Sequence, residues 1–308
     1  GKTLFIHFGK KTMKSAIISG ASGFISRNLI NYYKNKKVNL ICLSSKKNNK
    51  KQKNIKWIKL DKNYHFLKNK KYNFDTIFIS TGIGTVGKSN INKEKIREKK
   101  IFNNLLSLIK KNNQKCKIVF FSSYSVYGDV KKKSKENDKF KPLSSYAKNK
   151  INFEKKLKKL KNFEVIIFRL TSLYGPYLKK QLIWDTLQKV NKKKKMIFKG
   201  TGNESRDFIY IDDAIKAFAL LLRKKIKNNY EIFNCGTGKS TNVKRIVNLI
   251  LKLKKCKKEP DFNGKSEKYI PNKLMVNIGK LRNEKWHPSN SINSGLIKYL
   301  EWYRKLKI

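Results

Sequence analysis

Acidic residues are scarce in this chain of 308 residues, because 20 Asp and Glu stand against 75 Lys and Arg and leave a formal charge of +55. Histidine is rarer still, and His7, His65 and His287 have no potential ligand at helical or loop spacing, so we expect no metal centre. The four cysteines show no paired spacing, which predicts reduced thiols in a reducing compartment, the cytoplasm. The longest apolar run, residues 217–222, is far shorter than the roughly 20 residues that span a bilayer, so no membrane segment is expected.

Arginine is also uncommon within the basic excess, with 8 Arg against 67 Lys. A surface shaped to recognise phosphates or bases usually draws on the bidentate fork of arginine, and here lysine is spread through every segment. A uniform lysine excess is what an A/T-rich coding sequence would give. We therefore expect no nucleic-acid partner beyond nonspecific attraction to lysine, although the charge of +55 keeps an RNA-binding role open as an alternative.

Apolar residues make up 39% of the chain and aromatic residues 12%, which is enough for a large core. Short strand-like runs alternate with helix-like runs in which apolar residues recur every three or four positions. The expected strands are 15–19, 38–43, 55–60, 76–80, 118–121 and 165–170, and the expected helices include 101–109 and 146–160. This alternation predicts an α/β fold with a doubly wound parallel sheet.

The regular alternation weakens after Pro176, which predicts a smaller C-terminal α/β domain. We place the main domain at residues 13–175 and the smaller domain at 176–308. Residues 208–211 and 232–233 could return to the main sheet, so 208–235 could belong to the main domain. The first strand follows Met13 at once, so we expect Met13 to be the natural start and assign no function to residues 1–12.

A glycine-containing turn follows the first strand and opens a helix, reading Gly20-Ala21-Ser22-Gly23-Phe24-Ile25-Ser26. Glycine permits a tight turn and the close approach of a pyrophosphate, and the N–H groups of a helix N-terminus bind anions. The turn predicts a Rossmann-type dinucleotide site at Gly20, Gly23, Phe24 and Ile25. Its Gly-x-x-Gly-x-x-Ser spacing departs from Gly-x-Gly-x-x-Gly, and an ordinary strand-to-helix turn is the alternative.

The end of the second strand bears on which dinucleotide would bind. A dinucleotide site usually carries an acidic residue there for the ribose 2′-OH, but this segment reads Cys42-Leu43-Ser44-Ser45-Lys46-Lys47. Its hydroxyl and ammonium groups could hold a 2′-phosphate, so we expect NAD or NADP with a slight preference for NADP, unless the lysines only belong to the basic background. Asp61 could accept a hydrogen bond from an adenine amino group, or it serves a turn.

Tyr146 and Lys150 stand four residues apart at the start of a predicted helix, so both side chains lie on one face, one turn apart. A nearby ammonium favours the phenolate form, which suits a tyrosine to general acid/base work. Taken alone, the pair is more typical of an exposed surface in a chain this rich in lysine.

The order of the motifs is more specific than any one of them. After the glycine turn, residues 121–128 (Phe-Ser-Ser-Tyr-Ser-Val-Tyr-Gly) close a strand, and Tyr146 and Lys150 follow. In this order the chain, from about Met13 to Arg304, resembles the extended short-chain dehydrogenase/reductase superfamily, specifically its NAD(P)-dependent nucleotide-sugar epimerase/dehydratase branch. The further matching segments are residues 169–176, 206–213, 234–238 and 286–288.

The resemblance implies a role for each of three residues. Ser123 would hydrogen-bond the reacting sugar oxygen, and Tyr146 would transfer the proton. Lys150 would hold the nicotinamide ribose and tune the tyrosine, while the nicotinamide carries the hydride.

The resemblance also implies binding residues outside this triad. Ser80, Thr81 and Gly82, which follow the fourth strand, would line the cofactor. Arg206 would grip the nucleotide diphosphate, a role that suits a planar cation, and Ser172 stands at a substrate-contacting position.

Four departures from the family pattern narrow the expected activity. Dehydratases of this branch carry an Asp-Glu pair where this chain has Tyr124 and Ser125, which disfavours a 4,6-dehydratase. Ser172 replaces an Asn, Glu98 falls near the place of a helix Asn that shapes the site, and an Arg-x-x-Asp diphosphate clamp is absent from residues 269–272. These changes bear on which sugar is bound.

The sequence therefore predicts an NAD(P)-dependent nucleotide-sugar epimerase or 4-ketoreductase whose smaller domain binds the substrate, and the resemblance implies a homodimer. The motifs do not separate the two activities, because both use the same three residues. A non-catalytic RNA-binding or redox-sensing member of the superfamily and a reductase of a non-nucleotide carbonyl are the alternatives.

Overall fold

The computed structural model describes residues 13–46, 48, 52–65, 67, 71–80, 91–112, 115–192, 195–226, 228–265 and 270–306, with the side chains of 91–93 excepted. Some residues named above lie outside these ranges. They are residues 1–12, Lys47, Thr81, Gly82 and Tyr269.

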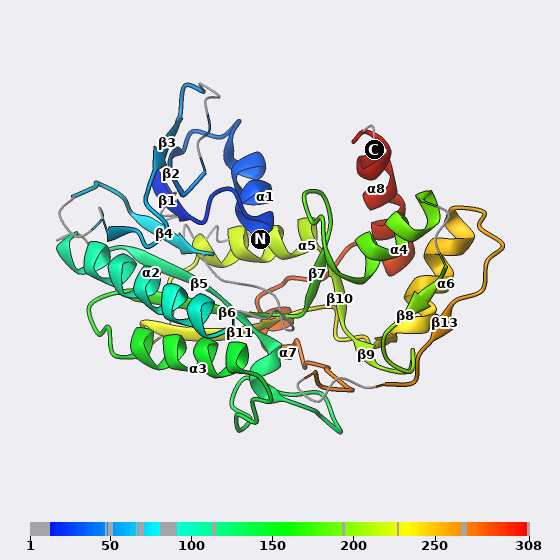
Figure 1. The fold of residues 1–308 in the computed structure, drawn as a ribbon. Helices are drawn as coiled ribbons and strands as arrows, with labels where there is room; N and C mark the ends of the chain where they lie inside the picture. The colour runs from blue at the N-terminus through cyan, green and yellow to red at the C-terminus, as the bar shows by residue number, and fades with distance from the viewer. Residues whose placement is uncertain are drawn as a thin grey trace, which may run out of the picture.

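Within the described residues, seven parallel strands form one sheet in the order β11-β6-β5-β4-β1-β2-β3 (Figure 1). The chain runs outward from β1 to β3 and then crosses back to β4, so the winding direction changes between β1 and β4. The doubly wound parallel sheet that the sequence predicts is therefore confirmed. The strands are β1 Ser15–Ser19, β2 Asn39–Ser44, β3 Ile55–Lys59, β4 Thr76–Ile79, β5 Lys117–Ser123, β6 Glu164–Leu170 and β11 Tyr230–Cys235.

Helices cover both faces of this sheet (Figure 1). On one face lie α1 (Phe24–Tyr33) and α5 (Ile211–Leu222), and on the other lie α2 (Ile91–Lys111) and α3 (Ser145–Lys158). Successive strand residues point to opposite faces, so Ile18 packs under α1 and α5 while Ile17 packs under α2 and α3. This explains why the strands are apolar without alternation, as expected of a sheet buried on both sides.

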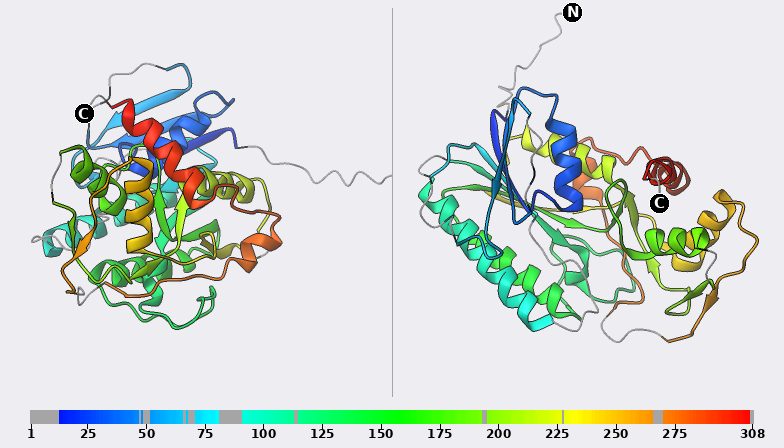
Figure 2. Two further views of the ribbon diagram at one scale, coloured as in Figure 1. Left: turned by 90° about the vertical axis from the view of Figure 1, so that its right-hand side faces the viewer. Right: turned by 45° about the horizontal axis from the view of Figure 1, so that its top comes forward.

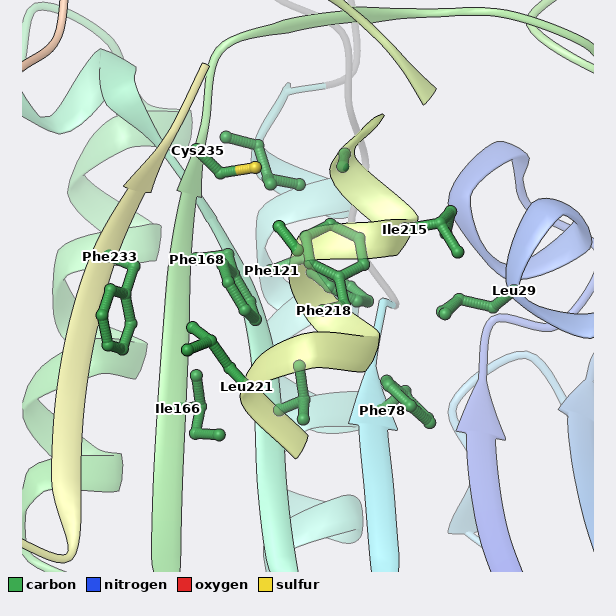
Figure 3. Close-up of a cluster of buried hydrophobic side chains, with 14 of the residues drawn as sticks. Leu29, Phe78, Phe121, Ile166, Phe168, Ile215, Phe218, Leu221, Phe233 and Cys235 are labelled. Carbon is green, nitrogen blue, oxygen red and sulfur yellow. The ribbon is translucent and has the colours of Figure 1, made fainter. Parts of the chain in front are cut away.

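The core beneath α5 is aromatic (Figure 3). The ring of Phe218 lies 4.7 Å from that of Phe121 and 4.6 Å from that of Phe168, centroid to centroid, and all three are buried. Asp212 and Asp213 in the first turn of α5 complement its helix dipole. Through these ring contacts, α5 packs on both β5 and β6, which carry residues of the candidate site at their carboxyl ends.

Most of the remaining elements form a smaller group beside the carboxyl ends of the strands (Figure 2). The described residues contain three two-stranded sheets here. They pair β7 (Ser172–Tyr174) with β10 (Phe208–Tyr210), β8 (Ile197–Phe198) with β13 (Asp261–Phe262), and β9 (Ser205–Arg206) with β12 (Thr241–Asn242). The helices of this group are α4 Gln181–Asn191, α6 Val243–Leu253 and α8 Ile292–Arg304, whereas α7 (Gly279–Asn283) packs against β11 of the main sheet.

Two segments that could have returned to the main sheet behave differently. β11 pairs with β6 over its whole length and forms one edge of the seven-stranded sheet, whereas β10 pairs with β7 outside it. The division into domains at residue 175 stays a prediction. Among the described residues, none of the helices combines the length and the apolar character that crossing a membrane requires.

Candidate active site

A cavity of about 800 Å³ opens at the carboxyl ends of the central strands, beside the smaller group of strands. In parallel α/β sheets this edge is where ligands bind, at the point where the winding direction changes. Nine of the residues predicted for the site line this cavity. They are Gly23, Phe24 and Ile25 at the start of α1, Ser80 after β4, Ser123 at the end of β5, Tyr146 and Lys150 of α3, Ser172 of β7 and Arg206 of β9.

The glycine turn after β1 has the backbone that a phosphate site requires. Gly20 has a positive φ of 61°, and a Cβ added to Gly23 would lie 3.0 Å from the carbonyl oxygen of Gly20. Gly23 is the N-cap of α1 and lines the cavity, and no described side chain caps this helix end, so the first N–H groups of the helix have no side-chain acceptor. The turn therefore fits a pyrophosphate.

Ser26 occupies the position where the family fingerprint has a third small residue. It is buried, and its Oγ donates to the carbonyl of Ser19 at 3.2 Å and contacts the hydroxyl of Ser80. Ser80 Oγ donates to the same carbonyl at 2.6 Å. The serine is accommodated because its hydroxyl is satisfied by the ends of β1 and β4, so the tight packing of α1 on the sheet is retained.

Tyr64 supports the glycine turn and is a residue that sequence reasoning missed. Its hydroxyl accepts a hydrogen bond from the Gly20 N–H at 3.2 Å and donates to the Leu43 carbonyl at 3.3 Å. Burial raises the pKa of Tyr64 to about 12, so the hydroxyl stays neutral. No local pattern points to this contact, because 44 residues separate the two partners.

Two predicted cofactor residues make local hydrogen bonds, and their role at the cofactor stays a prediction. Ser44 is buried, and its Oγ accepts from the backbone N–H of Lys46 at 3.0 Å. The carboxylate of Asp61 accepts from the backbone N–H groups of Asn63 and His65 at 2.7 and 2.9 Å. Neither residue lines the cavity, and the geometry of Asp61 is that of a turn residue.

A second cavity, of about 440 Å³, lies on the other side of α1, next to the end of β2. Arg27, Lys34 and Lys46 line it together with the indole of Trp57. No acidic side chain is among the described residues of its wall. The sequence predicts Lys46 as part of a possible 2′-phosphate site. Arg27 of α1 and Trp57 of β3 belong to no motif, so the sequence did not indicate them.

The start of α3 sets Tyr146 and Lys150 in place. Ser144 caps the helix by accepting from the Ala147 N–H at 3.2 Å, so Tyr146 stands in the first turn and Lys150 one turn later. The Nζ of Lys150 lies 5.5 Å from the centroid of the Tyr146 ring. Ser123 faces the same cavity from β5, and its Oγ accepts from the Ser125 N–H and hydroxyl at 3.2 and 2.9 Å.

A buried ion pair links the strands and the helix that carry these residues. Arg169 of β6 is 1% exposed, and its Nη2 lies 2.7 Å from Oε2 of Glu154 of α3. Glu154 also accepts from Ser122, the neighbour of Ser123, and Arg169 donates to Tyr127 at 2.8 Å. Burial acts to lower the pKa of Arg169, but the hydrogen bonds and charge of Glu154 outweigh it and raise that pKa. The pair ties β5, β6 and α3 together beneath the cavity.

The opposite wall carries polar groups of a different kind. The hydroxyls of Tyr124 and Ser172 lie 2.8 Å apart. Burial raises the pKa of Tyr124 to about 12, against the opposing charge of Arg206, so this phenol is neutral at ordinary pH. The Nη1 of Arg206 donates to the carbonyls of Ser205 and Asn272 at 2.8 and 2.9 Å, which leaves other guanidinium N–H groups for a ligand.

Asp207 holds the segment next to Arg206. It is fully buried and accepts from the Thr237 N–H, the Thr237 hydroxyl and the Gly238 N–H at 2.8, 2.7 and 2.7 Å. A Cβ added to Gly236 would lie 2.6 Å from its Oδ2, which explains the glycine there. Burial raises the pKa of Asp207 to about 6, although these donors act to lower it.

A family model described as the NAD dependent epimerase/dehydratase family matches residues 16–236, more than half of the chain. The chain belongs to this family. It is 28% identical over 327 residues to the ADP-L-glycero-D-manno-heptose-6-epimerase of Brachyspira hyodysenteriae, an alignment that covers 94% of this chain and 98% of the relative.

Solved structures share the fold over almost the whole chain. The UDP-N-acetylglucosamine 4-epimerase of Methanobrevibacter ruminantium in complex with UDP-N-acetylmuramic acid superposes with a TM-score of 0.85 at 20% identity, covering 95% of this chain and 99% of that one. The UDP-glucuronic acid 4-epimerase of Bacillus cereus in complex with UDP-glucuronic acid and NAD gives 0.82 at 20% identity, with the same coverage.

Within this epimerase/dehydratase family, the structure also shows what replaces the Asp-Glu pair that the resemblance associates with dehydratases. Tyr124 is buried against Ser172, and the Ser125 hydroxyl donates to Ser123. A neutral phenol and a hydroxyl are poor acids and bases at neutral pH, so these positions hold hydrogen-bonding groups in place of proton carriers.

Proposed function

We propose that this member of the epimerase/dehydratase family is an NAD(P)-dependent nucleotide-sugar epimerase or 4-ketoreductase. The observation that carries the proposal is that one cavity joins the phosphate-type turn before α1 with Ser123, Tyr146 and Lys150. The family match and the named activity of the Brachyspira hyodysenteriae relative, a nucleotide-sugar epimerase, support it.

Each of the three residues has a distinct task in this proposal. Tyr146 moves a proton at the reacting oxygen of the sugar, and Ser123 hydrogen-bonds the same oxygen. Lys150 holds the ribose next to the nicotinamide and favours the phenolate form of Tyr146. The nicotinamide, when bound, supplies hydride acceptance and donation.

The two activities differ in their overall redox balance. In epimerisation, the C–H hydrogen leaves as hydride and the O–H proton passes to Tyr146, and both return with the hydride on the opposite face, so nothing is oxidised overall. In ketoreduction, each carbonyl takes up one hydride and one proton, so one reduced dinucleotide is consumed per product. Only turnover measurements separate them.

We also propose that Arg206 binds the diphosphate of the substrate. Its guanidinium lines the cavity wall opposite the glycine turn, and two backbone carbonyls hold one of its nitrogens in place. A planar cation with free N–H groups is suited to bidentate phosphate binding.

The second cavity supports a preference for NADP. It lies at the end of β2, where a ribose 2′-OH is normally held by a carboxylate, and its wall presents Arg27, Lys34 and Lys46. Such a wall favours a 2′-phosphate over a free hydroxyl. We expect Arg27→Ala to raise the KM for NADPH several-fold more than that for NADH, with Arg245→Ala, at an exposed position of α6, as the unaffected control.

The proposal is tested by releasing and identifying any dinucleotide that copurifies, and by turnover with NADPH and a panel of 4-keto-6-deoxy sugar nucleotides. Stoichiometric NADPH oxidation identifies a ketoreductase. Interconversion of 4-hydroxyl sugar nucleotides without net oxidation identifies an epimerase. Failure to bind NAD(H) or NADP(H) at millimolar concentration, together with no turnover, would overturn the proposal.

A further inference from the structure

Glu98 is a buried carboxylate with no task in the scheme above. It lies on α2, is 5% exposed and reaches across to α3, the neighbouring helix on the same face of the sheet (Figure 1). Its Oε2 accepts from the amide of Asn149 at 3.2 Å, but its buried Oε1 has no hydrogen-bond partner among the described residues. A buried carboxylate with an unsatisfied oxygen is unfavourable unless a cation compensates its charge.

The compensating cation is Lys150. Its Nζ lies 3.6 Å from Oε1 of Glu98, and both side chains are almost fully buried. Two ring faces also lie near this ammonium, with the centroid of Phe120 at 5.0 Å and that of Tyr146 at 5.5 Å from Nζ. Glu98 is therefore the group that gives the flexible lysine stem one position, between α2 and the phenol ring.

We propose that Glu98 is a positioning residue that acts through Lys150. It holds the ammonium beside Tyr146 and offsets part of the positive charge that the phenolate would otherwise experience. The proposal rests on the proposed function, because it assumes that Lys150 serves Tyr146 and the ribose. An amide at this position could hydrogen-bond the lysine but could not offset its charge.

Other ionisable groups face the same end of α3, and none duplicates this effect. The carboxylate of Glu154 is neutralised by Arg169, and burial raises the pKa of Tyr124 and of Tyr127 to about 12, so both phenols are uncharged. Among the described residues on elements packed against α3, Glu98 is the carboxylate paired with Lys150. Its removal should therefore change the charge next to Tyr146.

The first experiment compares Glu98→Gln with Glu94→Gln, a half-exposed position on the same helix, in kinetics of the full chain from pH 6 to 9. Loosening the lysine should lower kcat of Glu98→Gln roughly tenfold to a hundredfold, while the KM for the sugar nucleotide stays within about twofold. Because a negative charge is lost, the phenolate becomes easier to form, so the rising limb of kcat/KM should move to lower pH.

A purely structural role for Glu98 would reduce the amount of active protein without moving the pH profile or separating kcat from KM. An unshifted profile with kcat within twofold of the parent would overturn the proposal. A Glu94→Gln variant with the same shift would also overturn it, because the effect would then belong to the helix surface.

The second experiment needs no turnover. Lys150→Met leaves Glu98 buried without a cation and should lower Tm by several degrees, and adding Glu98→Gln should restore part of the loss. Strictly additive Tm changes would contradict a direct pair. Titration with NADPH, followed by its fluorescence, should show weaker binding to Glu98→Gln than to Glu94→Gln, and equal binding would argue against the proposal.

These readouts separate the two proposals. If the parent protein neither binds a dinucleotide nor turns over any sugar nucleotide, the proposed function fails, whatever the Tm values show. If the parent is active and Glu98→Gln retains its rate and pH profile, the inference about Glu98 alone fails.

Discussion

The two walls of the candidate active site are built by different means. On the proposed dinucleotide side, the glycine turn and the start of α1 come directly after β1, a central strand of the seven-stranded sheet, and backbone groups form the surface of the cavity. On the opposite side, strands of two or three residues carry Ser172 and Arg206, which side-chain and carbonyl hydrogen bonds hold in place. On the first wall, substitutions that leave the backbone conformation unchanged should be tolerated. On the second wall, substitutions can alter substrate specificity with little loss of stability.

The largest effect should come from Tyr146→Phe, which removes the hydroxyl that we propose as the proton carrier. General acid/base catalysis contributes about 10²–10⁴-fold, so we expect a loss of kcat in that range with dinucleotide binding unchanged. Tyr124→Phe is the matched control, because it removes a neutral hydroxyl that contacts Ser172 and to which the proposal assigns no proton transfer. Steady-state kinetics measure both variants, and a larger loss in Tyr124→Phe would reverse the assignment.

The next effect concerns the buried ion pair on the sheet side. Glu154→Gln leaves Arg169 buried without its counter-ion, which should lower the free energy of unfolding by about 3–5 kcal/mol. Glu284→Gln breaks a half-exposed pair with Lys224 and should change it by less than about 1 kcal/mol. Urea unfolding measures both values, and equal losses would contradict a larger contribution from the buried pair than from the half-exposed one.

A third prediction uses the pH dependence of the substrate side. The pKa of Asp207 rises from 3.8 to about 6 on folding, because the carboxyl is buried. The folded state therefore binds the proton of this carboxyl more tightly than the unfolded state does. This proton binding contributes about 3 kcal/mol to the free energy of unfolding below pH 4, and the contribution is lost as the pH rises through 6.

Asp207→Asn isolates this contribution. The free energy of unfolding of the parent minus that of the variant should be larger at pH 4 than at pH 7, and exposed Asp261→Asn should show no such change. A difference that instead grows toward pH 7 would mean that the Thr237 and Gly238 donors prevail over burial.

The smallest expected effect is that of Arg206→Ala. The variant should raise the KM for a sugar nucleotide about tenfold, which corresponds to 1.4 kcal/mol, with kcat and dinucleotide binding little changed. Arg245→Ala, at an exposed position of α6, is the control. An unchanged KM would argue against a diphosphate grip and in favour of a non-nucleotide carbonyl substrate.

Much of the fold was predictable because its signals are local. The strand runs near β1 to β6 and the helix at Tyr146 are found within a few residues of the expected positions. The helix expected at 101–109 in fact begins at Ile91, since the lysine-rich first half of α2 lacks the apolar periodicity of the second half. The pairing of β10 with β7 was not predictable, because a three-residue strand contains too little pattern to select its partner.

The candidate site was predictable only in part, for the same reason. Helical geometry places Tyr146 and Lys150 one turn apart, and the resemblance added Ser123. The hydrogen bond from Gly20 to Tyr64 and the ion pair between Glu98 and Lys150 join distant parts of the chain, so no spacing rule could indicate them.

Short-range order in the chain was therefore enough to establish the alternation of strands and helices, the glycine turn and the one-turn spacing of Tyr146 and Lys150, because backbone sterics and helical periodicity act between near neighbours. Only the tertiary structure decided three further features of the site. Glu98 of α2 is the charge partner of Lys150, and Tyr64, after β3, bonds the backbone of Gly20. Tyr124 is buried against Ser172 of β7 and is therefore neutral. Burial and electrostatics depend on which groups surround a side chain in space, and the folded arrangement alone supplies those neighbours.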